Sequence, residues 1–317
     1  MSKKRYAVTG CAGFIGSNLT DRLLSEGHEV VGIDNLTTGR EAFLEYACSS
    51  DKFDFKNIDI LNTDELTVAL NGCNTVFHLA ANADVKDGLK QPGKDINQNT
   101  LGTFSVLEAM RGNGIKEIGF ASTGSVYGEA QKIPTPEDCA FPIQTSLYAA
   151  SKLAGEALVS AYCEGYGFKG VTFRFVGILG ERYTHGHIFD FMKKLHRNNA
   201  VLHVLGNGTQ KKSYLYVQDC IDAMLLAMNA SIKNYEVFNL GTDEFCEVTD
   251  SIQVICSELG VNPELILGTE DRGWVGDNPF IYLDTKKIRS LGWEPKLKIR
   301  EGVKRTIRYL AKNRWVF

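Results

Sequence analysis

A short apolar strand that runs directly into three closely spaced glycines is the strongest constraint on this chain. The strand begins at Tyr6, and the glycines are Gly10, Gly13 and Gly16. The first glycine allows a tight turn, the second lets the backbone approach a pyrophosphate, and the third lets the following helix pack against the strand. A plain turn between a strand and a helix can carry the same pattern, so the surrounding sequence decides between the two.

The surrounding sequence favours a dinucleotide site. An amphipathic helix is expected over residues 14–24, a stop at Gly27, and a second apolar strand over 29–33 that ends in Asp34. Asp34 lies eighteen residues after Gly16, near the spacing at which an acidic residue accepts hydrogen bonds from an adenosine ribose. The extra phosphate of NADP would meet a like charge there. The sequence therefore predicts NAD as the cofactor.

Strands and helices alternate up to about residue 175. Further strands are expected over 53–59, 75–80, 115–121 and 170–174, and helices over 64–70, 103–111 and 148–162. This alternation predicts an α/β fold with a doubly wound parallel sheet of the Rossmann type, whose ligands bind beyond the carboxyl ends of the strands. After residue 175 the rhythm loosens. We therefore expect a NAD-binding domain over 1–175, to which 213–241 contributes, and a smaller substrate-binding lobe over 176–317.

Composition and charge exclude several classes of function. The net charge of −3 gives no positive field for nucleic acid or acidic membranes, and no segment approaches the roughly 20 apolar residues of a membrane span. The start of the chain is basic, but glycines cut short the apolar run of a signal peptide. The eight cysteines include no Cys-x-x-Cys pair, which favours free thiols in a reducing cytoplasm. His185 and His187 have no third ligand nearby, so no metal is expected.

The candidate chemistry centres on Tyr148 and Lys152. They are four residues apart in an expected helix and therefore share one face. A phenol is a poor base at neutral pH unless a nearby cation stabilises its phenolate, and Lys152 is placed to do so. A surface pair can have the same spacing, but Ser122, Thr123 and Ser125 end the preceding strand and favour a catalytic site. Neighbours on a strand point to opposite faces, so Ser122 and Thr123 cannot both face it.

These segments together resemble the extended short-chain dehydrogenases/reductases that act on nucleotide sugars, most closely the UDP-glucose 4-epimerases. The likeness covers nearly the whole chain. The motifs that carry it are Thr9 to Gly16, Val31 to Leu36, Asp59 with Ile60, His78 to Ala81, Asn99, Phe120 to Gly128, Tyr148 with Lys152, and Gly208 to Tyr214.

The resemblance implies a role for each matching residue. Tyr148 would be the acid/base at the fourth carbon of the sugar, Lys152 would lower its pKa and bind the nicotinamide ribose, and Thr123 would hydrogen-bond the reacting oxygen. The implied NAD-binding residues are Gly10, Gly13, Phe14, Ile15, Gly16, Asp34, Asn35, Asp59, Ile60, Ala80, Ala81, Asn99, Tyr148 and Lys152. The implied partners are a nucleotide-diphosphate sugar and a second copy of the chain, paired through the helix that ends near Arg111 and the 148–162 helix.

The net reaction stays open at this point. If the hydride returns to the other face of the keto sugar, the enzyme is a 4-epimerase. If the ketone leaves, it is a 4-dehydrogenase or ketoreductase. A NAD-binding scaffold without catalysis is a third reading, against which the intact Thr123, Tyr148 and Lys152 argue. The resemblance also disfavours elimination and decarboxylation, because Gly124 and Ser125 stand where dehydratases and decarboxylases of the family carry acidic residues.

Several positions depart from the epimerase pattern and leave the nucleotide and the sugar undetermined. Gly177 replaces an asparagine near the diphosphate. Lys212 and Trp274 stand where arginine is frequent, with Arg272 as a substitute. Ile281 replaces an aromatic residue near the hexose. Gly177 and Ile281 would make room for an N-acetylated hexosamine or a heptose, unless neighbouring side chains fill the space.

Overall fold

The computed structural model describes residues 3–85, 88, 90–140, 143–230, 233–273, 278 and 280–317. The chain forms two compact units. Unit 1 comprises Met1–Val126, Ser146–Arg174 and Met224–Phe238, and unit 2 comprises Tyr127–Thr145, Phe175–Ala223 and Asn239–Phe317. The sequence expectation placed a boundary at 175. The segment Tyr127–Thr145 lies in unit 2, although that boundary assigned it to the first domain.

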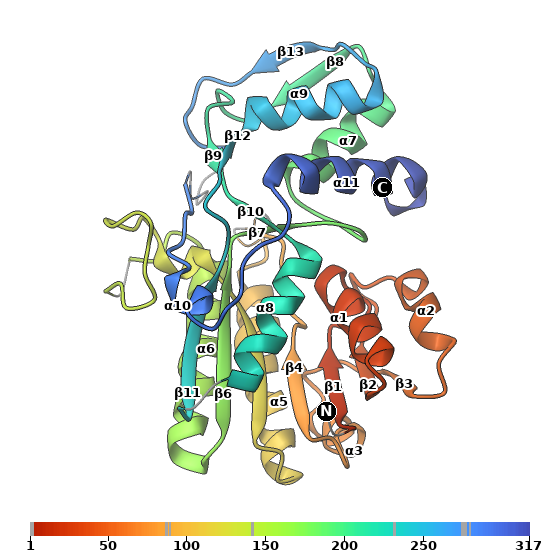
Figure 1. Ribbon diagram of the computed structural model, residues 1–317, viewed down its shortest axis with the longest axis vertical. Coiled ribbons are helices and arrows are strands. Elements are labelled where there is room, and N and C mark those ends of the chain that lie inside the picture. The colour runs from red at the N-terminus through yellow and green to blue at the C-terminus, as the bar shows by residue number, and fades with distance from the viewer. Residues whose placement is uncertain are drawn as a thin grey trace. The chain divides into compact units, whose positions relative to one another are not determined.

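Unit 1 is organised around a seven-stranded sheet with the order β11-β6-β5-β4-β1-β2-β3 (Figure 1). The strands are β1 (Arg5–Thr9), β2 (Glu29–Asp34), β3 (Phe53–Asn57), β4 (Thr75–His78), β5 (Glu117–Thr123), β6 (Lys169–Phe175) and β11 (Tyr235–Leu240). β1 pairs in parallel with both β2 and β4, so that Ala7 stands opposite Val31 and Val76. The chain reverses its direction of travel across the sheet between β1 and β4, which is where ligands bind in doubly wound folds. The predicted fold class is confirmed.

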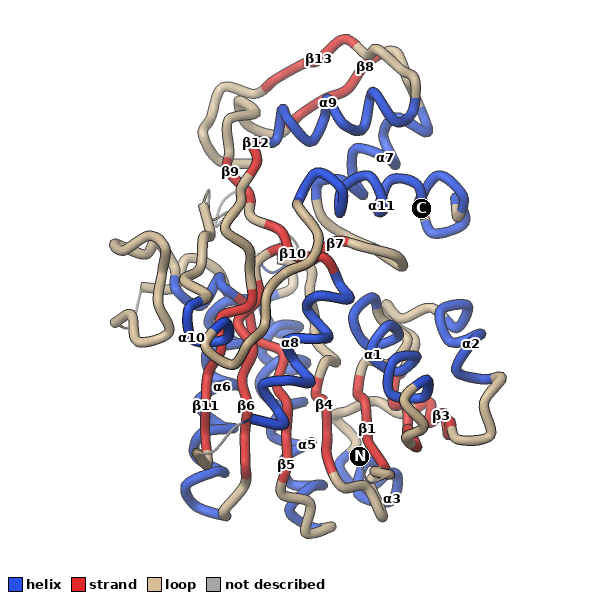
Figure 2. Tube along the Cα trace, viewed as in Figure 1, coloured by secondary structure: helices blue, strands red, loops and turns tan. Residues whose placement is uncertain are grey.

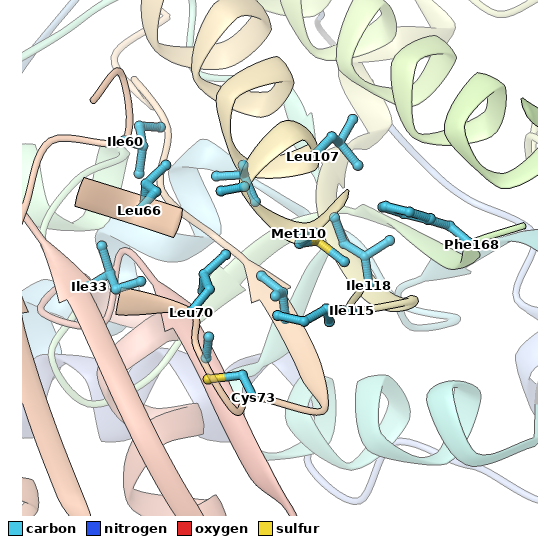
Figure 3. Close-up of a cluster of buried hydrophobic side chains, with 14 of the residues drawn as sticks. Ile33, Ile60, Leu66, Leu70, Cys73, Leu107, Met110, Ile115, Ile118 and Phe168 are labelled. Atoms are coloured by element: carbon cyan, nitrogen blue, oxygen red, sulfur yellow. The ribbon is translucent and has the colours of Figure 1, made fainter. Parts of the chain in front are cut away.

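Helices cover both faces of this sheet (Figure 2). Those that contribute to unit 1 are α1 (Phe14–Ser25), α2 (Glu45–Cys48), α3 (Thr63–Ala69), α4 (Pro92–Asp95), α5 (Gly102–Gly112), α6 (Leu147–Tyr166) and part of α8 (Val217–Ala230). α3, α5 and α6 pack on one face through a buried apolar cluster that includes Ile33 of β2, Leu66 of α3 and Leu107 of α5 (Figure 3). Burial of one such side chain contributes about 1.5–3 kcal/mol, so this cluster fixes the helices on the sheet.

The helix before β5 contains an irregular turn. α4 continues through the π-helical turn η3 (Ile96–Leu101) into α5. π-helical turns occur mostly as single turns and often at functional sites. The sequence predicted the end of this long helix but not the turn, which carries Asn99.

Unit 2 is built from short strand pairs and four helices of its own. β7 (Gly177–Leu179) pairs in parallel with β10 (Tyr214–Tyr216), β8 (Val201–Val204) pairs in parallel with β13 (Glu264–Leu267), and β9 (Lys211–Lys212) pairs antiparallel with β12 (Cys246–Glu247). The helices are α7 (His187–Arg197), α9 (Val248–Leu259), α10 (Lys286–Arg289) and α11 (Ile299–Lys312). All eight cysteines of the chain are free. Within the described ranges no helix has the length and apolar character needed to cross a membrane.

Candidate active site

The turn between β1 and α1 is closed too tightly for side chains. Gly10 has a φ of +73°, and a Cβ there would lie 2.7 Å from the backbone nitrogen of Ala80. A Cβ on Gly16 would lie 2.0 Å from the carbonyl oxygen of Gly10. The turn, the first residues of α1 and the segment of Ala80 and Ala81 after β4 can therefore come together only with glycine at both positions. The expected roles of the first and third glycines in turn formation and helix packing are confirmed.

The beginning of α1 suits an anion. α1 begins at Phe14 after Gly13, whose extended backbone (φ −82°, ψ 178°) contributes no capping side chain. The first N–H groups of a helix have no partner within the helix and face outward together with the positive end of its dipole. Phe14 and Ile15 begin this first turn, so the turn fits the pyrophosphate of a dinucleotide.

Asp34 ties the glycine turn to the loop after β2. Its carboxylate accepts hydrogen bonds from the backbone nitrogens of Ala12 (3.0 Å) and Leu36 (2.8 Å). Burial raises the pKa of Asp34, and these two hydrogen bonds act in the opposite direction. Asp34 thus holds the turn in shape, and its oxygens retain lone pairs for the hydroxyls of a ribose.

The adenine-side residues form a second connection between strand ends. The Asn35 amide donates to Asp59 at 2.9 Å, and Asp59 also accepts from the backbone nitrogen of Leu61. Ile60 is buried in the apolar cluster of unit 1, so its side chain belongs to the core.

A chain of hydrogen bonds crosses the switch point of the sheet. Thr103 donates to the carbonyl of Asn99 at 2.6 Å, so its oxygen accepts from Nε2 of His78 at 3.0 Å. Nδ1 of His78 then accepts from the Thr9 hydroxyl at 2.7 Å, and that oxygen accepts from the backbone nitrogen of Ala80. Burial lowers the pKa of His78 to about 3, and the nearby charge of Lys152 acts in the same direction. His78 is therefore a neutral connector that supports the ends of β1 and β4.

Asn99 is buried and fully engaged with the protein. Its Oδ1 accepts from the backbone nitrogen of Asn82 at 2.8 Å, while its amide donates to the carbonyl of Asn82 and to the Ser151 hydroxyl. The family position was expected to face the cofactor. In the structure the Asn99 side chain instead connects the loop after β4 to helix α6, through Asn82 and Ser151.

Tyr148 and Thr123 meet at the end of β5. Ser146 caps α6 by accepting from the backbone nitrogen of Ala149 at 3.1 Å, which places Tyr148 in the first turn. Burial raises the pKa of Tyr148 to about 12, a hydrogen bond with Thr123 acts against this, and the charge of Asp95 adds to the rise. Thr123 also accepts from the backbone nitrogen of Ser125. The hydroxyls of Tyr148 and Thr123 are therefore neighbours at the end of β5.

Lys152 lies one turn further along α6. It is 3% exposed, its Nζ donates to the carbonyl of Ala121 at 2.8 Å, and it lies 5.0 Å from the centre of the Phe120 ring. Burial lowers its pKa to about 8, while Glu156 acts in the opposite direction. Ser122 donates to Glu156, one turn further along the same helix. Its hydroxyl is engaged there, which leaves Thr123 as the hydroxyl beside Tyr148.

The space expected at Gly177 in unit 2 is filled. A Cβ on Gly177 would lie 2.6 Å from two ring carbons of Tyr214. The Tyr214 hydroxyl is 2.5 Å from Nδ1 of His187, which fixes the ring in place. The expectation that Gly177 enlarges the pocket is wrong at this position, because the ring of Tyr214 occupies the space that a side chain would take.

The two basic residues expected near the diphosphate already have partners within the protein. Lys212 donates to the carbonyl of Asn278 at 3.1 Å, and Arg272 forms an ion pair with Glu129 at 2.6 Å. A diphosphate would therefore compete with Glu129 for Arg272. Ile281 is half-buried, and the rings of the residues on either side of it stack at 5.7 Å. Trp274 lies outside the described residues.

The histidines that resemble a metal pair have other contacts. His187 bonds to Tyr214, and His185 stacks on Tyr183 at 6.0 Å. Across the residues for which the structure gives positions, His, Cys, Asp and Glu form no group of three suited to a metal ion.

The sequence did not predict four residues that contact these sites. Glu156 could have been predicted, because it follows Lys152 by the same four residues that separate Lys152 from Tyr148. Arg174, Tyr214 and Glu129 could not have been, since their partners Glu156, Gly177 and Arg272 lie 18, 37 and 143 residues away along the chain.

Several proteins similar to this chain in sequence and fold are named as UDP-glucose 4-epimerases. The UDP-glucose 4-epimerase of Mycolicibacterium smegmatis is 34% identical over 313 residues, which cover 96% of this chain and 98% of that protein. The crystal structure of the Thermotoga maritima UDP-glucose 4-epimerase with UDP-glucose superposes with a TM-score of 0.87 at 32% identity, covering 98% and 99% of the two chains. The Thermus thermophilus UDP-glucose 4-epimerase in complex with NAD gives 0.86 at 31% identity, covering 97% and 99%.

The family can now be stated. Residues 6–241 match the model of the NAD dependent epimerase/dehydratase family. The matched part includes the glycine turn, Asp34, Thr123, Tyr148 and Lys152, and the match confirms NAD as the cofactor. The tight glycine turn and the uncapped start of α1 fit that cofactor physically. The chain therefore belongs to the NAD dependent epimerase/dehydratase family.

Proposed function

We propose that this protein catalyses NAD-dependent 4-epimerisation of a nucleotide-diphosphate sugar. The observation that carries the proposal is the juxtaposition of Tyr148 with Thr123, one helical turn before the buried Lys152. The relatives from M. smegmatis and T. maritima, named as UDP-glucose 4-epimerases, support the same reaction class.

In this proposal residues of unit 1 transfer the proton of the sugar hydroxyl. When bound, NAD supplies reversible hydride transfer at the fourth carbon. Tyr148 takes the proton of the hydroxyl on that carbon and later returns it, and Thr123 holds the same oxygen by a hydrogen bond. Because burial raises the pKa of Tyr148 to about 12, its phenolate needs a cation nearby. The Lys152 ammonium supplies that charge.

The proposed division of labour follows the two units. Unit 1 would bind NAD through the glycine turn, the loops that carry Asp34 and Asp59, and Ala80 and Ala81. Unit 2 would bind the nucleotide sugar through the region of Gly177, Lys212, Arg272 and Ile281. This assignment is supported by the polar and basic groups in each unit, and the nucleotide and the sugar are to be found by experiment.

The test is turnover without added cofactor. The purified protein is first examined for bound NAD by its absorbance, and then incubated with a panel of UDP, GDP, dTDP and CDP sugars. We expect retained NAD and formation of the 4-epimer with no net NADH, because an epimerase returns its hydride in every cycle. Stoichiometric NADH with a keto sugar and no epimer would identify a dehydrogenase. Bound NAD without turnover of any sugar would identify a scaffold.

A further inference from the structure

One buried carboxylate beside the catalytic pair has no part in the proton transfer described above. Glu156 follows Lys152 by four residues on α6, as Lys152 follows Tyr148, so the three side chains form a row along one face of the helix. A charged group buried in this way is costly unless it is paired and hydrogen-bonded. The burial of the Glu156 carboxylate therefore requires compensating contacts.

The carboxylate of Glu156 is held from two neighbouring strands. From β6, the Arg174 guanidinium donates to it from Nε (3.0 and 3.2 Å to the two oxygens) and from a terminal nitrogen (2.7 Å). From β5, the Ser122 hydroxyl donates to Oε1. The Glu156 and Arg174 side chains are 4% and 12% exposed. A bidentate pair of this kind is geometrically specific, so the carboxylate has one position.

The same two-residue stretch of β5 receives Lys152. The Lys152 ammonium donates to the carbonyl of Ala121, and the next residue, Ser122, donates to Glu156. Helix α6 is thus fastened to the end of β5 at two successive residues, directly before Thr123. Movement of Glu156 would therefore shift both Lys152 and the strand end that presents Thr123.

We propose that Glu156, held by Arg174 and Ser122, is the positioning residue of this site: its carboxylate fixes the Lys152 ammonium against β5 and keeps it charged. This inference rests on the proposed function in one respect only, namely that the Lys152 ammonium stabilises the Tyr148 phenolate during catalysis. Glu156 acts through Lys152 and does not touch the substrate.

The charges around this row decide the sign of the effect. The charged and titratable groups near it are Tyr148 and Glu156 on α6, Arg174 on β6, His78 on β4, Tyr235 on β11 and Asp95 on α4. His78 is neutral at physiological pH because its pKa is about 3. Loss of the Glu156 charge would remove the negative charge that favours the Lys152 ammonium. Loss of Arg174 would leave the carboxylate, which favours it.

The experiment measures the titration of Lys152 directly. The protein is labelled with 13C at the lysine Cε, and the Lys152 signal is identified by its absence in Lys152→Arg. We expect a midpoint near pH 8 in the unmodified chain. Glu156→Gln should lower this midpoint by about one pH unit or more, as expected for removal of an opposite charge at close range, and Arg174→Gln should raise it.

Glu164→Gln is the matched control. It removes the same charge from an exposed position of the same helix, about 18 Å along the axis from Lys152 at 1.5 Å per residue. This exceeds the screening length in physiological salt, so the midpoint should not move.

The outcomes separate positioning from general packing. An unchanged midpoint in Glu156→Gln would overturn the proposal, as would equal downward shifts in Glu156→Gln and Arg174→Gln. If Glu156→Gln does not fold, Arg174→Gln decides alone: a raised midpoint supports the proposal and any other result rejects it. The titration needs no substrate. A chain that lacks epimerase activity but shows the expected shifts would therefore contradict the proposed function and leave the role of Glu156 intact.

Discussion

Burial displaces the pKa values of both Tyr148 and Lys152 from their ordinary values. Burial raises the pKa of the phenol to about 12 and lowers that of the ammonium to about 8. Near neutral pH the resting pair is therefore a neutral phenol beside a cation held only narrowly. Burial outweighs the expected lowering of the Tyr148 pKa by Lys152, so the phenol is a weaker acid here than in water.

Removal of the phenol should separate chemistry from binding. Tyr148→Phe keeps the ring and loses the hydroxyl, so we expect turnover to fall by about two to four decades while bound NAD is retained. The measurements are kcat on the best sugar of the panel and the NAD content of the purified variant. Tyr166→Phe removes the same group from an exposed position at the end of α6 and should leave both unchanged. A Tyr148→Phe variant with more than half of the original activity would exclude Tyr148 as the base.

The contact between Gly177 and Tyr214 predicts a steric coupling. Gly177→Ala forces a methyl group into the Tyr214 ring, and overpacking of this kind costs about 1–3 kcal/mol of unfolding free energy. Combining it with Tyr214→Ala should relieve that cost, so the two effects should not add. Urea unfolding of the two single variants and the double variant measures the coupling.

A glycine with open space around it provides the comparison. At Gly165, on α6, an added Cβ would meet nothing within 4 Å, so Gly165→Ala should be neutral or slightly stabilising. If Gly177→Ala were equally neutral, the ring of Tyr214 would not be filling that space. The space at Gly177 would then be open to a larger sugar.

At the scale of elements, the ends of β1 and β4 depend on one neutral histidine. His78 joins Thr9 of β1 to Thr103 of α5, and its pKa is about 3 against an ordinary value near 6.5. Below about pH 6.5 the unfolded chain therefore binds a proton at His78 that the folded chain does not bind. The free energy of unfolding decreases as the pH falls from about 6.5 towards 3.

This connection predicts an acid-dependent loss of stability that can be assigned to one residue. Between pH 7.5 and pH 5, the original chain should lose about 2 kcal/mol more unfolding free energy than His78→Gln, at about 1.4 kcal/mol for each pH unit below 6.5. The amide of glutamine can still link the two threonines without titrating. His203→Gln changes an exposed histidine of β8 and should retain the full loss. Equal losses in the original chain and His78→Gln would contradict the assignment.

The elements of unit 1 could be predicted because their signals are local. The first six strands were expected from short local runs of the sequence, and the predicted bounds differ from the observed ones by a few residues. The strands of unit 2 have two to four residues each, and their pairing partners lie far away in the sequence. Long-range pairing decides such strands, and no local pattern contains it.

The same distinction holds for the candidate site. Thr123, Tyr148 and Lys152 follow from spacing along one strand and one helix. The π-helical turn at Asn99 and the Arg174 contact with Glu156 depend on how three elements meet, which a single sequence does not reveal.

At the scale of the whole molecule, we expect a homodimer. Apolar residues are exposed by between 38% and 51% on η3, α5 and the start of α6, namely Ile96, Leu101, Phe104 and Leu147. Light scattering at micromolar concentration should give about twice the chain mass of 35.1 kDa, and Phe104→Glu should reduce it to one chain mass because a charge in an apolar interface is costly. Val68→Glu, at an exposed position of α3, is the control. A mass near 35.1 kDa for the original chain would defeat the prediction.

The apolar residues of these helices divide into a buried and an exposed group. Val106 and Leu107 of α5 and Val159 of α6 are buried in the core of unit 1. Phe104 of α5 remains among the exposed apolar side chains. Helical period alone could not separate the two groups, because both lie on faces that carry apolar residues.

Asp34 has a consequence for changing the cofactor by engineering or by natural drift. Its carboxylate holds the glycine turn through hydrogen bonds from Ala12 and Leu36, and it is also the group that we expect to discriminate against a 2′-phosphate. Replacement by a small neutral residue, the obvious route to NADP, would release two backbone N–H groups in a buried place. Coenzyme specificity and folding stability in this chain therefore depend on the same side chain. A change of specificity from NAD to NADP requires a second substitution that stabilises the glycine turn in place of Asp34.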